Sequence, residues 1–330
     1  MEDIIMDTNY IRIFKDLFFN IDENESVKST IEKVNYLLSS IIIKYGEIEN
    51  ENAYGISRQD DFIDIVMCLF IRKIMEQLDA INVLFSISSF NQAQILLRSL
   101  IENTVSLEFI LKDETEKRAA AYYLEHHYQE IELGKTYFNK NSKFGKLMLQ
   151  HKGAEQFDHD YGLFKKKEEA FKRIISSKEI FQIVDKAREE KIQQKENLNR
   201  KQHKPWKKVH IQWYEVCSDV SNFYELMKET GYELYYQGIY GGLSYETHAL
   251  NSTMDLTVNE NGLNLKRIRN PVGGSSSFDL TCSFSISALT KLYKYLKDGI
   301  EEIKEFEKFY IDFQEKRKIV NNNLDMIINS

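Results

Sequence analysis

The chain has 330 residues, of which 42% are hydrophobic, so it is long enough for one large domain or two modest ones. Lys and Arg total 44 against 51 Asp and Glu, and the net charge of -7 argues against a wholly basic nucleic-acid coat protein. With 2 prolines and 14 glycines, collagen-like, proline-rich and turn-dense all-β folds are excluded, which leaves helices as the default.

The first 133 residues carry four helical patterns. Apolar residues recur at intervals of three and four, which is the spacing of an amphipathic helix. This spacing predicts helices over residues 27–45, 61–85, 93–111 and 115–133. The third is apolar on more than one face, so we expect it near the centre of a helical bundle, where every polar side chain needs a partner.

Residues 165–208 differ in charge from the rest of the chain. They contain 15 Lys or Arg and 7 Asp or Glu, which gives +8 and leaves -15 for the remainder. The first half is typical of a solvated helix, whereas residues 193–208, which include Pro205, indicate a loop. We therefore expect residues 165–210 to form a basic, partly flexible insertion in a single large domain of residues 1–330.

The C-terminal third combines helices with one hairpin. Alternating apolar residues on both sides of Asn261-Gly262 predict a small β-hairpin within residues 252–270. The other predicted elements are a helix over 214–230, a glycine-broken tyrosine stretch over 231–242, a loop over 270–277 and a closing helix over 286–313. The predicted fold class is mainly α, a helical bundle with one small β-hairpin.

The cysteines and the apolar segments indicate where the protein resides. Cys68, Cys217 and Cys282 are widely spaced and odd in number, so neither a disulfide framework nor a zinc ribbon is predicted. The longest apolar stretch, residues 62–71, contains Asp64 and is far shorter than the roughly 20 residues of a membrane span. Acidic residues near the start argue against a secretory signal. We expect a cytoplasmic protein that does not enter a membrane.

The sequence lacks the motifs of the common cofactor-dependent enzymes and hydrolases. It contains no Gly-x-x-x-x-Gly-Lys phosphate loop, no Gly-x-Gly-x-x-Gly, no His-Glu-x-x-His and no Gly-x-Ser-x-Gly. The paired Glu-x-x-His motifs of di-iron bundles are missing as well. We therefore predict neither a metal nor a cofactor.

Arg98 and Glu102 form the first candidate site. They are four residues apart in the apolar pattern of residues 93–111, which places them on one helix face within reach of each other. One interpretation is a buried salt bridge that sets the helix register, at a desolvation cost that other groups must offset. The other is a polar site in which Arg98 binds an anion such as phosphate and Glu102 orients Arg98.

Tyr240, Ser244 and His248 form the second candidate site. Ser244 and His248 are also four residues apart, and a helix that begins at the preceding glycines gives them a common face. A histidine acting as general acid or base, together with a nearby arginine, is the minimum for RNA cleavage without a metal. The alternative is a histidine that caps a helix or lies satisfied in the core. Ser244 and His248 without a clear acid are weak evidence for a hydrolase triad.

At these residues the sequence resembles the bacterial family called domain of unknown function 5677. The resemblance lies in Leu96-Leu97-Arg98-Ser99-Leu100-Ile101-Glu102 and, much later, in Tyr240, Leu243-Ser244 and His248 ahead of the hairpin. It covers the middle two thirds of the chain. It implies an all-helical bacterial protein that is similar in general character to the HEPN domains of toxin and antiphage systems.

The HEPN pattern itself is not met. HEPN ribonucleases carry Arg, then four to six residues, then His. The positions that would hold this arginine before His248 are residues 241–243, which are two glycines and a leucine, and Arg118 precedes His126 by one residue too many. A HEPN-type site would therefore have to be assembled from distant parts, with Arg98 on one helix and the histidine on another.

The basic segment offers a candidate nucleic-acid interface. Lysines pair with phosphates and tryptophan stacks on bases in proteins that bind single strands. The predicted contact residues are Lys165, Lys166, Lys201, Lys204, Trp206, Lys207 and Lys208. The alternative is a solvated helix followed by a mobile loop. The stretch 273–277 either offers backbone N–H groups to a phosphate or forms a plain connection.

These observations support two main functional hypotheses. The first is a cytoplasmic bacterial effector of phage defence or of a toxin system that cleaves RNA without a metal. Its Arg98 binds phosphate, and its His248 acts as acid or base with help from Tyr240 or Ser244. The second is a non-catalytic interaction module with a structural Arg98–Glu102 pair, and a small-ligand sensor is a third alternative. Whether the partner is RNA or a protein, and whether the chain forms a homodimer, stay open.

Overall fold

The computed structural model gathers the chain into two compact units. The first comprises residues 1–59, 67–111 and 230–330, and the second comprises residues 60–66 and 112–229. Within these ranges the structure describes residues 18, 21, 24–54, 62–204, 209–243, 256–259, 262–265, 267–271, 273–297 and 299–328. That residues 1–330 form a single domain stays a prediction.

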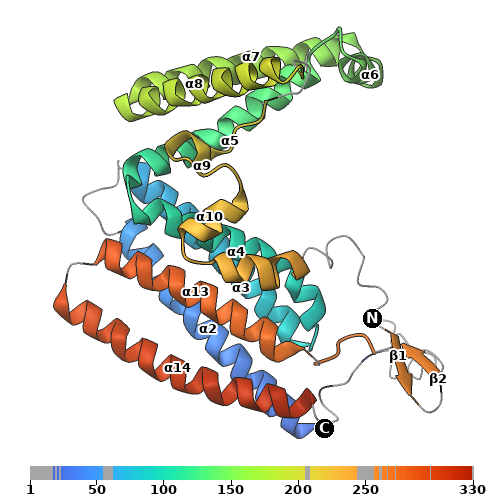
Figure 1. Cartoon of the computed structure of the whole chain (residues 1–330), viewed down its shortest axis with the longest axis vertical. Coiled ribbons are helices and arrows are strands. Elements are labelled where there is room, and N and C mark those ends of the chain that lie inside the picture. Colours follow the sequence, from blue (N-terminus) through green and yellow to red (C-terminus); the bar gives the residue numbers. More distant parts are fainter. Residues whose placement is uncertain are drawn as a thin grey trace, which may run out of the picture. The chain divides into compact units, whose positions relative to one another are not determined.

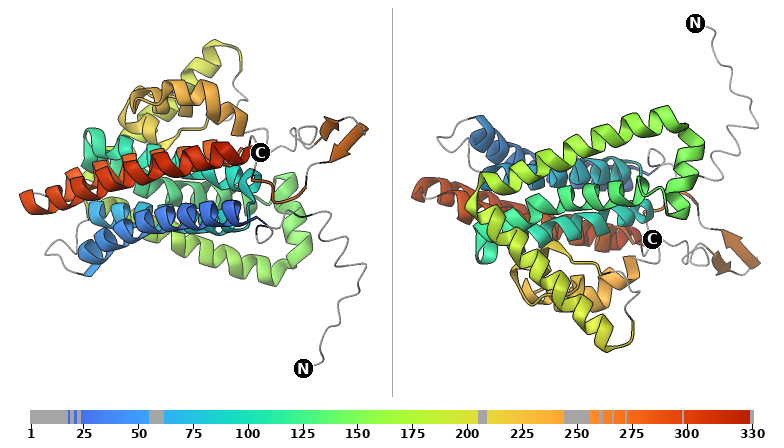
Figure 2. Two further views of the ribbon diagram at one scale, coloured as in Figure 1. Left: turned by 90° about the horizontal axis from the view of Figure 1, so that it is seen from below. Right: turned by 90° about the horizontal axis from the view of Figure 1, so that it is seen from above.

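The first unit is built from long helices and the hairpin. Its elements are α2 (Glu25–Tyr54), α3 (Phe62–Ser86, from Met67 onward), α4 (Phe90–Lys112, up to Leu111), α11 (Glu233–Tyr235), the π-helix η2 (Tyr236–Tyr240), β1 (Leu256–Asn259), β2 (Gly262–Leu265), α13 (Gly274–Leu296) and α14 (Ile300–Ile328). Helices α2, α13 and α14 pack side by side (Figure 1 and Figure 2). Their apolar faces form a core that includes Ile41, Phe278 and Phe313.

The second unit combines long and short helices around an aromatic core. Its elements are α5 (Thr115–Tyr137), α6 (Lys143–Lys152), α7 (Ala154–Ser177), α8 (Glu179–Lys201), α9 (Trp213–Cys217) and α10 (Phe223–Glu229). Helices α7 and α8 meet at Lys178 and lie side by side (Figure 1). The ring centroid of Phe138 lies 5.3 Å from those of Phe157 and Phe164, so these rings tie α7 to the end of α5.

The fold class is confirmed, and so are most of the predicted elements. The four early helices appear as α2 to α5, and the hairpin pairs Leu256 with Leu265 and Asn259 with Gly262 in antiparallel register. Gly262 has a φ of 107°, a left-handed value that only glycine adopts without strain. In the part of the chain that the structure describes, no helix is long and apolar enough to cross a membrane.

Two predicted loop regions are wrong in part, because helix extends into them. Helix α8 continues to Lys201, since much of 193–201 consists of good helix formers such as Gln, Lys, Glu and Leu. Residues 205–208 lie outside the described residues. Helix α13 begins at Gly274, so the predicted loop over 270–277 ends early, after the left-handed Gly273.

Two predicted helices are each divided into two. The predicted helix over 214–230 becomes α9 and α10, because Asn222 accepts the backbone N–H of Glu225 at 3.0 Å and so caps a new helix. The predicted helix over 286–313 is divided between α13 and α14, with extended backbone at Lys297 and a glycine at 299. Its apolar stripe therefore belongs to two helices that pack together rather than to one.

The close packing of α5 on α7 generates a prediction about two helical glycines. A Cβ atom on Gly134 would lie 2.1 Å from the Phe164 ring, whereas one on Gly162 meets nothing within 4 Å. We expect Gly134→Ala to lower the free energy of unfolding by about 1–3 kcal/mol through overpacking. Gly162→Ala should raise it by about 1 kcal/mol through helix propensity. Urea unfolding measures both, and equal stability of the two variants would contradict the packing.

Candidate functional site

The structure brings three of the predicted site residues together in the first unit. Arg98 and Glu102 lie one turn apart on α4, and the Arg98 Nε donates to Glu102 Oε1 at 3.3 Å. The Tyr240 hydroxyl donates to the same carboxylate oxygen from a position 138 residues away in the sequence. The Arg98 guanidinium carbon lies 4.6 Å from the centroid of the Tyr240 ring, at cation–π distance. We call these three residues the arginine cluster.

The arginine cluster is partly open to solvent. The side chains of Arg98 and Glu102 are 25% and 43% exposed, which argues against the interpretation as a fully buried salt bridge. The Tyr240 residue is buried, and burial together with the hydrogen bond to Glu102 raises the pKa of its phenol well above the usual range. The phenol therefore stays protonated at neutral pH and can serve as a hydrogen-bond donor.

The π-helix η2 positions Tyr240. The ring of Tyr236 stacks on that of Tyr240 at 5.2 Å between centroids, and the Gly241 N–H bonds to the Tyr236 carbonyl. A π-helical turn is rare and is often found at functional sites. A cavity of about 430 Å³ borders this segment, and its lining includes Leu97, Gly238, Gly242 and Ser276. It leaves space for a ligand beside the segment that carries Tyr240.

A second polar network fixes the rotation of α4 against α3. Gln77 Nε2 donates to Ser99 Oγ at 2.7 Å, and Asn103 Nδ2 donates to Gln77 Oε1 at 3.0 Å. Ser99 and Asn103 each follow a residue of the arginine cluster directly, so the network sets the direction in which the cluster points. Sequence reasoning missed this network, because serine and asparagine on a helix are most often solvated.

A buried carboxylate in the first unit was also missed. Glu108 on α4 is 1% exposed, forms an ion pair with Lys291 on α13 and accepts a hydrogen bond from the Tyr232 hydroxyl at 2.9 Å. The Tyr232 hydroxyl also lies 2.7 Å from Ser287 Oγ. Tyr232 begins the segment that leads to Tyr240, so this network anchors the approach to the arginine cluster. The only sequence signal was a glutamate on a helix expected to be central.

Two predicted site residues and part of the predicted nucleic-acid interface lie outside the described residues. These are Ser244, His248, Trp206, Lys207 and Lys208. Among the described lysines, Lys165 and Lys166 lie in the middle of α7, while Lys201 ends α8 and Lys204 follows it. All four are exposed.

The structure partly neutralises the basic segment. Lys165 pairs with Glu168 at 2.7 Å, Lys167 with Glu130 at 3.2 Å, and Lys195 with the buried Glu215. Glu168 is already counted in the net charge of the segment, but Glu130 and Glu215 lie outside the segment. Their pairs with Lys167 and Lys195 therefore lower the attraction to phosphate below what that net charge indicates. Across the described ranges, no group of three or more His, Cys, Asp or Glu is arranged to hold a metal ion.

The described elements define a mainly helical protein with a partly exposed arginine, glutamate and tyrosine cluster. The chain belongs to the family of unknown function DUF5677, whose model matches residues 64–264. The match spans all three members of the arginine cluster and Glu108. A search of the curated proteins and a search of the solved structures each find no match.

The Glu108 network leads to a stability prediction. Lys291→Met should lower the free energy of unfolding by about 2–3 kcal/mol, because it leaves a buried carboxylate without its cation. The double variant Glu108→Gln with Lys291→Met should recover part of this loss, since it removes the buried charge as well. Chemical denaturation of both variants measures the difference, and a double variant that is less stable than Lys291→Met would contradict the role of the ion pair.

The arginine cluster should contribute little to stability. Its ion pair is partly exposed, and it adds one cation–π contact, between Arg98 and Tyr240. We therefore expect Arg98→Ala and Glu102→Gln each to lower the free energy of unfolding by at most about 1 kcal/mol. Thermal and urea unfolding measure this. A loss as large as about 3 kcal/mol for either variant would instead mark the pair as part of the structural core.

Proposed function

We propose that this chain is a metal-independent endoribonuclease, an effector of the HEPN-like kind that acts in phage defence or in a toxin system. The observation that carries the proposal is the convergence of Arg98, Glu102 and Tyr240 from distant parts of the chain on one partly exposed site. A guanidinium held in place by a carboxylate and a ring is suited to bind a phosphodiester.

In the proposed reaction the ribose 2′-oxygen attacks the adjacent phosphorus. Arg98 donates hydrogen bonds to the non-bridging oxygens, where negative charge accumulates in the transition state. Glu102 orients Arg98 through Nε, and the protonated phenol of Tyr240 keeps both in place. His248 takes the proton of the 2′-hydroxyl and returns it to the departing 5′-oxygen, with Ser244 assisting. The products are a 2′,3′-cyclic phosphate and a 5′-hydroxyl.

The test is cleavage of tRNA and mRNA by the purified full chain in the presence of EDTA. We expect the wild type to produce fragments with 5′-hydroxyl ends, and Arg98→Ala and His248→Ala each to slow cleavage by about 100-fold or more. Substrates with 2′-deoxyribose should resist cleavage because they lack the nucleophile. Expression in bacteria should be toxic for the wild type but not for Arg98→Ala or His248→Ala.

Arg72→Ala is the matched control. Arg72 also belongs to an arginine–glutamate ion pair of the first unit, at 2.8 Å from Glu49, but lies outside the arginine cluster. It should cleave RNA at the wild-type rate. Intact RNA with the wild type under all conditions, or equal cleavage by wild type and both site variants, would refute the proposal.

A non-catalytic interaction module is the second candidate function. It is favoured by the fact that Arg98, Glu102 and Tyr240 satisfy one another without a ligand. In that case the partner is a protein or a nucleic acid, and the exposed lysines of α7 and α8 contribute to its binding. A second copy of this chain, which would give a homodimer, is one such protein partner. This function would be favoured if the wild type leaves RNA intact and if Arg98→Ala has a markedly lower melting temperature.

A further inference from the structure

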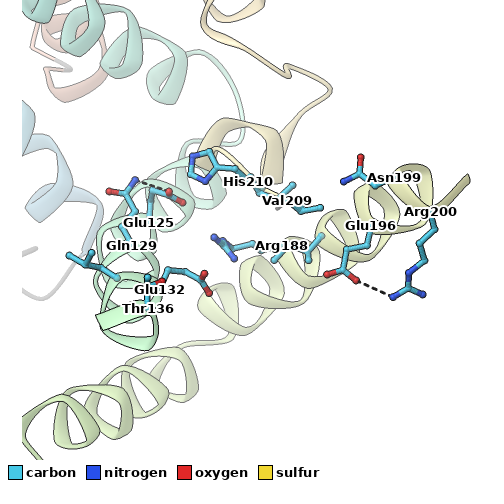
Figure 3. Close-up of a pocket in the computed structure, with 13 residues that line it drawn as sticks. Glu125, Gln129, Glu132, Thr136, Arg188, Glu196, Asn199, Arg200, Val209 and His210 are labelled. Atoms are coloured by element: carbon cyan, nitrogen blue, oxygen red, sulfur yellow. Dashed lines mark hydrogen bonds and ion pairs between the residues drawn. The ribbon is translucent and has the colours of Figure 1, made fainter. Parts of the chain in front are cut away.

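The second unit contains a polar cavity that has no part in the proposed ribonuclease site. Its volume is about 630 Å³, within the range of pockets that hold small molecules. Side chains from α5 and α8 form two of its walls, and residues 209–211 form a third (Figure 3). The residues that matter for the argument are Glu125, Gln129, Arg188 and His210.

Arg188 supplies a cation to the cavity. Its guanidinium carbon lies 4.1 Å from the centroid of the Tyr128 ring, and the Tyr128 hydroxyl donates to Asp185 at 2.6 Å, which fixes the ring. The Nε of Arg188 is buried and has no hydrogen-bond partner among the described residues. A buried N–H without an acceptor is unfavourable by about 1–3 kcal/mol. An anionic ligand group beside the guanidinium, which lines the cavity, would offset part of this cost by charge attraction.

The opposite wall supplies hydrogen-bond acceptors. Glu125 on α5 is 6% exposed and accepts one hydrogen bond, from Gln129 at 2.9 Å. Burial raises the pKa of Glu125, although Gln129, Arg188 and His210 act in the opposite direction. Figure 3 shows Arg188 pointing from α8 toward the α5 wall, with His210 above the space between them. The cavity thus presents a cationic donor on one wall and a carboxylate with further capacity to accept hydrogen bonds on the other.

The rest of the lining adds charged and apolar side chains, among them a further carboxylate, Glu132 of α5. Arg200 and Glu196 line the outer end of α8 and pair with each other at 3.8 Å. Leu133, Ile192 and Ile211 add apolar surface between the polar groups. This combination suits a compact molecule with two polar ends and an apolar middle.

We infer that the cavity between α5 and α8 binds a small molecule that carries a carboxylate or phosphate group and, at its other end, hydroxyl or amino donors. Arg188 holds the anionic group, and Glu125 accepts from the donors. His210 contributes a further hydrogen bond from the third wall. Nucleoside monophosphates have this chemistry, and so do amino acids whose side chains carry a hydroxyl, amide or amino group.

The test is isothermal titration calorimetry with thermal unfolding of the full chain. One arm uses a mixture of the four ribonucleoside monophosphates and the other a mixture of the twenty amino acids, with inorganic phosphate and acetate as single-group probes. We expect one mixture to bind saturably and to raise the melting temperature. Arg188→Gln and Glu125→Gln should each weaken that binding by about tenfold or more.

Arg173→Gln is the matched control, since Arg173 is an exposed arginine of the same unit that does not line the cavity. It should bind as the wild type does. Arg188→Lys tests the role of the fork of donors, because it keeps the charge and should still bind more weakly. No binding of either mixture, or equal binding by a folded Arg188→Gln, would overturn the inference.

Discussion

The buried carboxylate of Glu108 is the constraint on which the first unit depends. A carboxylate in a helical core is stable only with a cation and donors, and here Lys291 of α13 and the Tyr232 hydroxyl supply them. These contacts hold α4, α13 and the Tyr232 segment together. Because α11 and η2 run directly from Tyr232 to Tyr240, the network that satisfies a core charge also anchors the segment that brings Tyr240 to Arg98.

The two candidate sites differ in how far their polar groups are satisfied. In the arginine cluster each charge has a partner, so a phosphate would bind by sharing the donors of Arg98 with Glu102. In the cavity of the second unit the Arg188 side chain lines open space, and its buried Nε has no hydrogen-bond partner among the described residues, so a ligand would add a counter-charge there rather than displace one.

The errors in the predicted elements have a common physical cause. Apolar spacing continues through residues 214–230 and 286–313, but the helices there end where Asn222 caps a new helix and where Gly299 follows extended backbone. The signals were present in the sequence as Ser and Asn at 221–222 and as Asp-Gly at 298–299. In these two segments, local capping and turn residues ended a helix that the apolar spacing alone would have continued. At residues 193–201 a helix formed although few residues are apolar, because most of them have high helix propensity.

The sequence by itself determined the helical class, the hairpin and the pairing of Arg98 with Glu102, because helix faces and tight turns depend on residues a few positions apart. Only the tertiary structure decided that Tyr240 lies on this pair, that Lys291 neutralises Glu108 and that Arg188 faces Glu125 across a cavity. These pairs consist of residues 63 to 183 positions apart, and which helix faces meet depends on how the cores pack rather than on local spacing.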